Sequence, residues 1–229
     1  MKQLRTFFLM IELLLSNFIF GSDEGLSLVD YELIAAATKG DESSIKEALA
    51  AGAYIDAQDY CMRTALHWAT FRGSYSCVKL LLEEGATSTI KDNSHRIPLH
   101  WAARKSHHEC MKLLLKYTPD INTQGSYDNL PLHEAVEESS SACLQTLLES
   151  GADFFVKNRH GLTAIELAIH KEKWDMRKIL KKWLKDLKKK EKAEEKQEQE
   201  ELKKQTKEKI RNLRGTRKKT VKVYCSCFF

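Results

Sequence analysis

The sequence has few of the residues that interrupt or cross-link a chain. Its 229 residues include 10 Gly and 3 Pro, which excludes collagen-like and mucin-like chains. Six Cys are too few for a disulfide scaffold. No apolar run reaches the roughly 20 residues that a membrane-spanning helix needs. Because 42% of the residues are hydrophobic and 30% are charged, the chain can bury a core, and a wholly disordered chain is excluded.

The common catalytic and phosphate-binding motifs are also missing. The sequence contains no G-x-x-x-x-G-K-[ST], no G-x-S-x-G and no H-E-x-x-H. His107, His108 and Cys110 lie close together, but no second His or Cys pair stands at the spacing of a zinc site. We therefore expect no enzymatic activity, no cofactor or bound metal, and no small-molecule substrate.

Residues 1–21 have the layout of a secretory signal peptide. Lys2 and Arg5 precede the mostly apolar stretch 7–20, and a small, acidic segment follows Gly21. We expect cleavage after Gly21 and a secreted or periplasmic protein. Glu12 and Asn17 interrupt the stretch, so the alternative is an apolar helix that is retained. A retained segment would place the protein in the cytoplasm or at a membrane surface.

A 33-residue period runs through the middle of the chain. Counting back 33 residues from Leu66 gives Leu33, which belongs to a degenerate first copy. The recurring segments are T-A-L-H-W-A at 64–69, I-P-L-H-W-A at 97–102, L-P-L-H-E-A at 130–135 and T-A-I-E-L-A at 163–168. Gly52, Gly85 and Gly151 keep the same period, and Thr118 occupies the remaining copy, where we expect a rebuilt turn. The amphipathic helix predicted after each segment has an apolar face too wide for one unit to bury, so the units must stack.

These residues resemble the ankyrin repeat, whose signature is T-P-L-H-x-A followed by a second helix and a Gly-Ala turn. The resemblance implies an all-α solenoid of stacked helix-turn-helix units with β-turn tips, followed here by a charged C-terminal helix. We divide the chain into the signal peptide 1–21, a repeat domain 22–184 and a tail 185–229. The five repeats are expected at 27–58, 59–91, 92–124, 125–157 and 158–184.

The residues that recur in every repeat are expected to be structural. In the ankyrin family the motif His hydrogen-bonds the backbone and the motif Thr. The residues that we expect to be structural are Leu66, His67, Leu99, His100, Leu132, His133, Gly85 and Gly151. Cys77, Cys110 and Cys143 fall on successive second helices, which lie too far apart for a disulfide, so we expect buried thiols. Trp68 and Trp101 are expected to pack between first helices.

In the ankyrin family, partners usually contact the turn tips and the concave side of the first helices. At these positions the second and third repeats present basic and aromatic side chains, and the fourth presents two acidic ones. The residues predicted to bind a partner protein are Tyr60, Arg63, Phe71, Arg72, Arg96, Arg104, Lys105, Tyr127, Glu137, Glu138, His170 and Lys171. Such a surface favours recognition of a protein by charge complementarity around apolar anchors. The alternative is an ordinary solvated face.

The composition changes after Trp183. Residues 181–222 contain 18 Lys and Arg against 8 Asp and Glu, whereas residues 22–180 contain 17 against 23. Interspersed Glu and Lys favour a solvated helix that ends at Gly215, and a disordered tail is the alternative. The basic residues of 181–222 are suited to an anionic membrane or to nucleic acid. Cys225 and Cys227 leave acylation, metal binding and cross-linking open.

The sequence therefore predicts a non-enzymatic adaptor that binds an unidentified partner protein through its concave ankyrin surface. The N-terminal segment adds export to this prediction, and the resemblance adds a role as an effector. The alternative is a membrane-surface or nucleic-acid-binding scaffold that acts through the basic C-terminal tail.

Overall fold

The computed structural model describes residues 26–226. The expected signal peptide and Cys227 lie outside this range. The described residues are helical wherever they form regular structure, without a strand, which confirms the predicted all-α class. They belong to two compact units, the first ending at Arg177 and the second beginning at Lys178.

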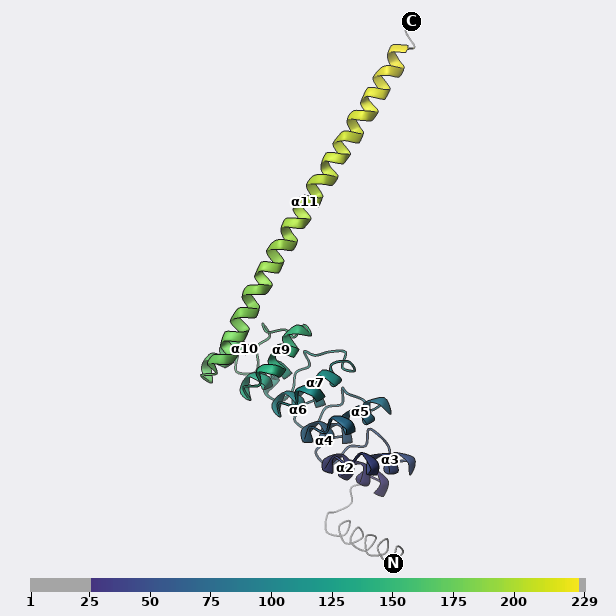
Figure 1. Cartoon of the computed structure of the whole chain (residues 1–229), viewed down its shortest axis with the longest axis vertical. Coiled ribbons are helices and arrows are strands. Elements are labelled where there is room, and N and C mark those ends of the chain that lie inside the picture. The colour runs from purple at the N-terminus through teal and green to yellow at the C-terminus, as the bar shows by residue number, and fades with distance from the viewer. Residues whose placement is uncertain (1–25, 227–229) are drawn as a thin grey trace, which may run out of the picture. The chain divides into compact units, whose positions relative to one another are not determined.

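The first unit is built from pairs of short helices that follow the 33-residue period (Figure 1). The pairs are α2 (Leu28–Lys39) with α3 (Glu42–Ala50), α4 (Ala65–Arg72) with α5 (Tyr75–Glu83), α6 (Pro98–Arg104) with α7 (His108–Leu114), and α8 (Pro131–Glu137) with α9 (Ser141–Glu149). A short 3₁₀ helix, η1 (Ser126–Asp128), precedes α8, and α10 (Ala164–His170) precedes α11 (Trp174–Ser226). The first helices α2, α4, α6, α8 and α10 pack in that order, and α3, α5, α7 and α9 form a second row.

The core lies between these two rows of helices. Leu66, Leu99 and Leu132 are completely buried, and each contributes about 1.5–3 kcal/mol relative to an exposed side chain. The second helices add Cys77, Cys110 and Cys143, which are buried and free, as the sequence predicts. Burial raises the pKa of the Cys110 thiol to about 11, so this thiol stays protonated at neutral pH.

The motif histidines join the second, third and fourth repeats to the repeats that follow them. The Nδ1 atoms of His67, His100 and His133 accept the backbone N–H at the start of their own helix, at 3.1, 3.3 and 3.2 Å. Each Nε2–H then donates to a carbonyl of the following repeat, 29 residues later, at 3.1–3.2 Å. The backbone donor fixes the proton on Nε2, because Nδ1 can accept only without one. The imidazole therefore sets both the helix start and the register between repeats.

Two further features of the sequence have direct local consequences. Where the motif Thr is replaced by Ile97 and Leu130, Pro98 and Pro131 occupy the first helical position, where a fixed φ favours the helix. At Thr118 the turn is rebuilt as expected. The helix α7 ends at Leu114, whose carbonyl accepts the Thr118 N–H at 2.9 Å, and Thr118 does not adopt a positive φ.

The helix α11 continues beyond the point expected from the sequence. We expected Gly215 to end it, but the helix extends to Ser226. One interior Gly costs only about 1 kcal/mol relative to Ala, and the surrounding Lys and Arg residues favour a helix. Within the second unit, the side chains from Lys188 to Lys209 are exposed. Among the described residues, none of the helices is both long enough and apolar enough to cross a membrane.

We predict that His100 makes stability depend on pH. Burial lowers its pKa from 6.5 to about 4, so the unfolded chain binds a proton more readily between these values. The free energy of unfolding therefore falls as the pH drops from about 6.5 toward 4, and His100 alone accounts for about 2 kcal/mol between pH 7.5 and 5.0.

Urea unfolding of His100→Gln and of the unchanged protein at both pH values tests this. The destabilisation caused by the substitution should be about 2 kcal/mol smaller at pH 5.0 than at pH 7.5. The raised pKa of Glu134 acts in the opposite direction but is common to both proteins. The same destabilisation at the two pH values would contradict the prediction.

Candidate protein-binding surface

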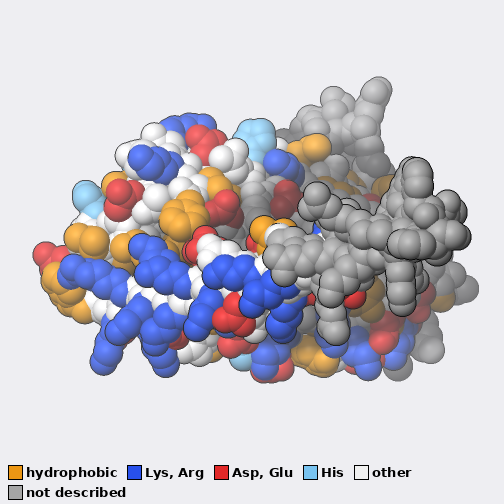
Figure 2. Space-filling view, turned by 90° about the horizontal axis from the view of Figure 1, so that it is seen from above, with side chains coloured by type: hydrophobic (Ala, Val, Ile, Leu, Met, Phe, Trp, Pro, Cys, Tyr) orange, Lys and Arg blue, Asp and Glu red, His pale blue; other side chains and the backbone are white. Residues whose placement is uncertain are grey.

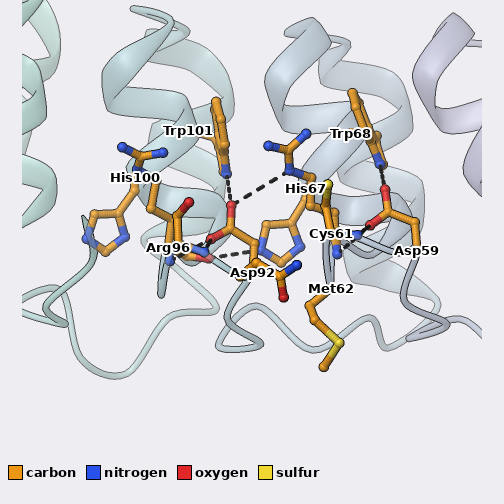
Figure 3. A network of polar contacts seen from close by, with 12 residues as sticks. Asp59, Cys61, Met62, His67, Trp68, Asp92, Arg96, His100 and Trp101 are labelled. Carbon is orange, nitrogen blue, oxygen red and sulfur yellow. Dashed lines mark hydrogen bonds and ion pairs between the residues drawn. The ribbon is translucent and has the colours of Figure 1, made fainter. Parts of the chain in front are cut away.

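An Asp and a Trp brace the turn tip of the second repeat, and an equivalent pair braces the third (Figure 3). The Oδ1 atoms of Asp59 and Asp92 each accept two backbone N–H groups within their own turn, at 2.8–2.9 Å. Their Oδ2 atoms accept the indole N–H of Trp68 at 2.9 Å and of Trp101 at 3.0 Å. Each tryptophan is thereby fixed to the turn that precedes its helix.

Arginine side chains fill the spaces between the fixed indoles. The Arg63 Cζ lies 5.0 Å from the ring centroid of Trp68 and 4.9 Å from that of Trp101, so the guanidinium is stacked between them. The Arg96 Cζ lies 5.3 Å from the Trp101 ring, and its Nε lies 3.6 Å from Glu134 Oε1. The Arg63 and Arg96 side chains are only 24% and 12% exposed, although the sequence placed them on the binding surface. Arg63 contributes to it mainly by separating the two indoles, and Arg96 by separating Trp101 from Glu134.

Phe71 is the exposed member of an aromatic cluster on the same face. Its ring makes edge contacts with Trp68 at 5.8 Å and with Trp101 at 5.3 Å between centroids. The Lys105 Nζ lies 4.5 Å from the Phe71 centroid, within the range of a cation–π contact. The phenyl ring remains 36% exposed. The cluster of Phe71, Trp68, Trp101 and Lys105 therefore presents an apolar surface whose shape is fixed before any partner binds.

The fourth repeat departs from this arrangement at three equivalent positions. Gly125 stands where the earlier repeats have Asp59 and Asp92, and Asn129 stands where they have arginine. Glu134 replaces the tryptophan. The Gly is required in this turn, because a Cβ added to Gly125 would lie 2.7 Å from the His100 imidazole. The chain therefore has neither the indole nor the stacked guanidinium at this point.

Glu134 is a buried carboxylate with incomplete compensation. Its side chain is fully buried, with Arg96 Nε 3.6 Å from Oε1 and Arg104 Nη1 3.4 Å from Oε2. Burial raises the pKa of Glu134, and the two arginines offset only part of that shift. Within the described part of the chain, Oε1 has no hydrogen-bond partner.

A pocket of about 590 Å³ opens beside Glu134, between α8 and α10. Six of the predicted binding residues line it: Arg96, Arg104, Tyr127, Glu137, His170 and Lys171. Its volume is within the roughly 300–1,000 Å³ that is typical of ligand pockets. The Tyr127 ring is stacked on His160 with centroids 6.0 Å apart, which gives the pocket one flat aromatic wall.

The predicted residues thus form two groups, one around Phe71 and one around the pocket. Tyr60, Arg72 and Glu138 are exposed but belong to neither group. Figure 2 shows basic, acidic and hydrophobic side chains next to one another on one face of the molecule. Glu134 was not predicted as a site residue, and Asn129 was placed only among the turn positions. The signal of both was the simultaneous loss of Asp, Arg and Trp at three positions of the 33-residue register.

The turn tips carry backbone strain at the same register position. Met62, His95 and Asp128 have φ of 57°, 59° and 57°, and only Gly161 supplies a glycine there. A left-handed conformation costs a residue with a Cβ about 1–2 kcal/mol. Met62 and His95 nevertheless keep their side chains exposed at the tips. Large exposed side chains at strained positions make Met62 and His95 candidates for a functional role.

His107 and His108 form hydrogen bonds between repeats. His107 Nε2 lies 3.1 Å from the Phe71 carbonyl, and His108 Nε2 lies 2.8 Å from Thr146 Oγ1. Among the residues that the structure describes, no group of three or more His, Cys, Asp and Glu is arranged to hold a metal ion.

We predict that Met62→Gly and His95→Gly each stabilise the protein by about 1 kcal/mol, because glycine adopts a positive φ without a Cβ clash. Chemical denaturation gives the free energy of unfolding. Ser94→Gly in the same turn, at a residue without a positive φ, is the control and should lose stability. A loss of stability in all three variants would show that the tips are not strained.

The comparisons with known proteins agree with this architecture. The family model "Ankyrin repeats (3 copies)" matches residues 33–125 and 90–158, which is more than half of the chain. A search of curated proteins gives no significant match. The chain is a member of the ankyrin-repeat family, whose repeats serve in general as non-enzymatic modules of protein–protein interaction.

Proposed function

We propose that the protein is an adaptor that captures a partner protein on the concave side of its first helices. The observation that carries this proposal is the fixed aromatic cluster around Phe71. The ring is partly exposed, yet Trp68, Trp101 and Lys105 already restrict it. When a partner covers this ring, the side chains of the cluster lose little conformational entropy, because the cluster is preorganised.

The backbone strain at the turn tips supports a binding site on the same face. Met62 and His95 keep large side chains where Gly161 shows that glycine would fit. A partner that contacts both the tips and the first helices would explain why side chains are kept at these positions. This face carries charges of both signs, with Lys105 in one group and Glu137 in the other, which favours selectivity over bulk adhesion.

We extend the proposal to export, with a role as an effector outside the producing cell. The export proposal rests on residues 1–21, which have a charged start and an apolar stretch, and on the small residues that follow this stretch. The buried, protonated Cys110 thiol is compatible with an oxidising compartment, because the thiolate is the reactive form.

We predict that a photo-crosslinking residue at position 71 forms an adduct with the partner, whereas the same residue at position 75 does not. Tyr75 is an exposed aromatic residue on the outer helix α5, so it is a matched control. Mass spectrometry of the adduct identifies the partner.

With the partner in hand, Phe71→Ala combined with Lys105→Ala should weaken its affinity at least about tenfold, because anchoring aromatics dominate such interfaces. Tyr75→Ala combined with Lys79→Ala should leave affinity unchanged. Arg104 is kept in both proteins, since its removal would leave Glu134 less compensated. Adducts of equal yield at positions 71 and 75, or equal affinities of the two double variants, would contradict the concave-face proposal.

Export is tested by the intact mass of the protein recovered from its native cell and from the medium. We expect the exported form to begin at Ser22, directly after the proposed cleavage site. A protein that begins at Met1 and stays in the cell would contradict export without affecting the binding proposal.

A further inference from the structure

Two rows of basic residues follow the 33-residue period through the first three repeats. The inner row stands at the ends of the first helices α2, α4 and α6, and the outer row lies within the second helices α3, α5 and α7. The side chains of both rows are exposed. The inner row is Lys39, Arg72 and Lys105, and the outer row is Lys46, Lys79 and Lys112. The two rows therefore have the same charge and the same spacing in sequence.

The outer row is neutralised within the chain. Each of its lysines forms an ion pair with a glutamate of its own helix, at 2.7, 3.7 and 3.4 Å. The glutamates stand three or four residues from their lysines, which is the spacing at which side chains share one face of a helix. They are Glu42, Glu83 and Glu109. The three pairs together have no net charge to offer a partner.

The inner row has no such carboxylates. The sequences of α4 and α6 contain neither Asp nor Glu. Asp41 stands in the loop after α2, but its carboxylate accepts four hydrogen bonds from Ser43 and Ser44 at the start of α3. Among the ion pairs between described residues, none includes a member of the inner row. The described part of the chain therefore leaves the positive charge of this row uncompensated.

Stabilisation of the helix ends does not account for the inner row. A cation near a helix C-terminus interacts favourably with the helix dipole. The same position of the fourth repeat nevertheless has Glu138, which is exposed at the end of α8 and bears the opposite charge. Since the fold accepts either sign at this position, the three consecutive cations need another explanation.

Packing between repeats joins the inner row to the surface around Phe71. A Cβ added to Gly40 would lie 3.6 Å from the Arg72 Cγ, so the arginine stem lies against the residue that follows Lys39. In the next repeat, the Lys105 Nζ lies 4.5 Å from the Phe71 ring centroid. Cations of three successive repeats therefore line one surface, and the partly exposed Phe71 ring is its apolar centre.

We propose that the inner row binds an extended, acidic segment of the partner protein, which places an apolar side chain on Phe71. The inference rests on the proposed function, because it assumes that a protein binds the concave face. It adds the chemistry by which that protein is recognised. Neighbouring helices pack roughly 8–10 Å apart, so contact with all three cations requires about six residues of extended chain at about 3.3 Å each.

A short acidic segment fits this row better than a uniform polyanion does. The run of cations ends at the third repeat, because Glu138 follows Lys105 in the register and Glu137 is its neighbour. A nucleic-acid backbone or an anionic membrane carries its charge without interruption and would meet these carboxylates. A peptide can confine its acidic residues to the length of the row, and it can also supply the apolar side chain for Phe71.

The inference can be tested without the partner by using a defined peptide. The probe is acetyl-Glu-Ser-Leu-Glu-Ser-Leu-Glu-amide, titrated into the full chain and followed by backbone amide shifts in NMR. We expect saturable shifts around Lys39, Phe71 and Lys105. The matched peptide with Gln in place of Glu should bind about tenfold more weakly, because each of three exposed ion pairs contributes about a factor of two in affinity.

Substitution of the two rows locates the site. Lys39→Gln, Arg72→Gln and Lys105→Gln combined should reduce binding of the acidic peptide to the level of the Gln peptide. Lys46→Gln, Lys79→Gln and Lys112→Gln combined remove the same charge from the same repeats and should change the affinity by less than about twofold. Gln keeps a high helix propensity, so circular dichroism should show unchanged helix content. Arg72→Gln alone should give about a twofold loss, so the test does not depend on the folding of a triple variant.

Several outcomes would overturn the inference. One is equal binding of the acidic and Gln peptides, and another is an equal loss of affinity in the two triple variants. A short oligothymidylate that binds more tightly than the peptide, and that loses affinity when the inner row is substituted, would assign the row to nucleic acid. The same result with phosphatidylserine vesicles would assign it to a membrane. The basic tail is common to all the proteins compared, so its own binding does not affect these comparisons.

Crosslinking at position 71 separates this inference from the adaptor proposal. An adduct with a partner whose contacting segment lacks acidic residues would overturn the inference and leave the adaptor proposal standing. Absence of an adduct, with the peptide still bound by the inner row, would overturn the adaptor proposal alone.

Discussion

The structure depends on one contact that the second, third and fourth repeats each make with the repeat that follows, the double hydrogen bond of the motif histidine. Nδ1 accepts the N–H at the start of its own helix, and Nε2–H reaches the carbonyl that precedes the next helix. A helix pair buries its apolar face only against its neighbours, so the register of that stacking decides which side chains meet. In the fifth copy Glu166 replaces histidine. Its carboxylate still accepts the Thr163 N–H at 2.8 Å, but it has no proton to donate onward. The fifth copy thus keeps the hydrogen bond within its own repeat and lacks the one to a following repeat. The element that follows it is α11 instead of another turn tip.

Because the register is fixed, the side chains at a few positions in each repeat determine the chemistry of the concave face. Asp, Arg and Trp together produce a closed surface in the second and third repeats, because each group satisfies or stacks on the next. Gly, Asn and Glu at the same positions produce a pocket with a buried carboxylate in the fourth. The core leucines are the same in all three repeats, so their packing is kept although the neighbouring side chains differ. One backbone therefore presents an aromatic anchor and a polar pocket side by side.

Much of this fold was predictable from the sequence, because a strict period identifies residues that share a role. The buried Leu66, the thiol of Cys110 and the rebuilt turn at Thr118 all follow from that reasoning. The binding surface was less predictable. Burial of Arg63 depends on Trp101, 38 residues away, and a period does not show which side chains face one another across a repeat boundary. In the sequence Glu134 is an ordinary substitution, and its contacts with Arg96 and Arg104 become visible only in the structure. The helix end expected at Gly215 was wrong because a local glycine penalty is smaller than the helical preference of the residues around it.

The distribution of unfavourable features separates structural from functional positions. Positive φ recurs at three places in most repeats: the turn tips, the loops that join first to second helices, and the ends of the second helices at Gly52, Gly85 and Gly151. In the loops the residues are Gly40, Gly73, Ser106, Ser139 and Glu172, which are small or fully solvated. At the tips, Met62 and His95 combine the same strain with large exposed side chains. The incompletely compensated charge of Glu134 lies on the concave side as well. Stability alone would favour glycine at the tips and an apolar residue in place of Glu134. The proposed partner contact at the tips and on the first helices rests on these features, which stability alone does not explain.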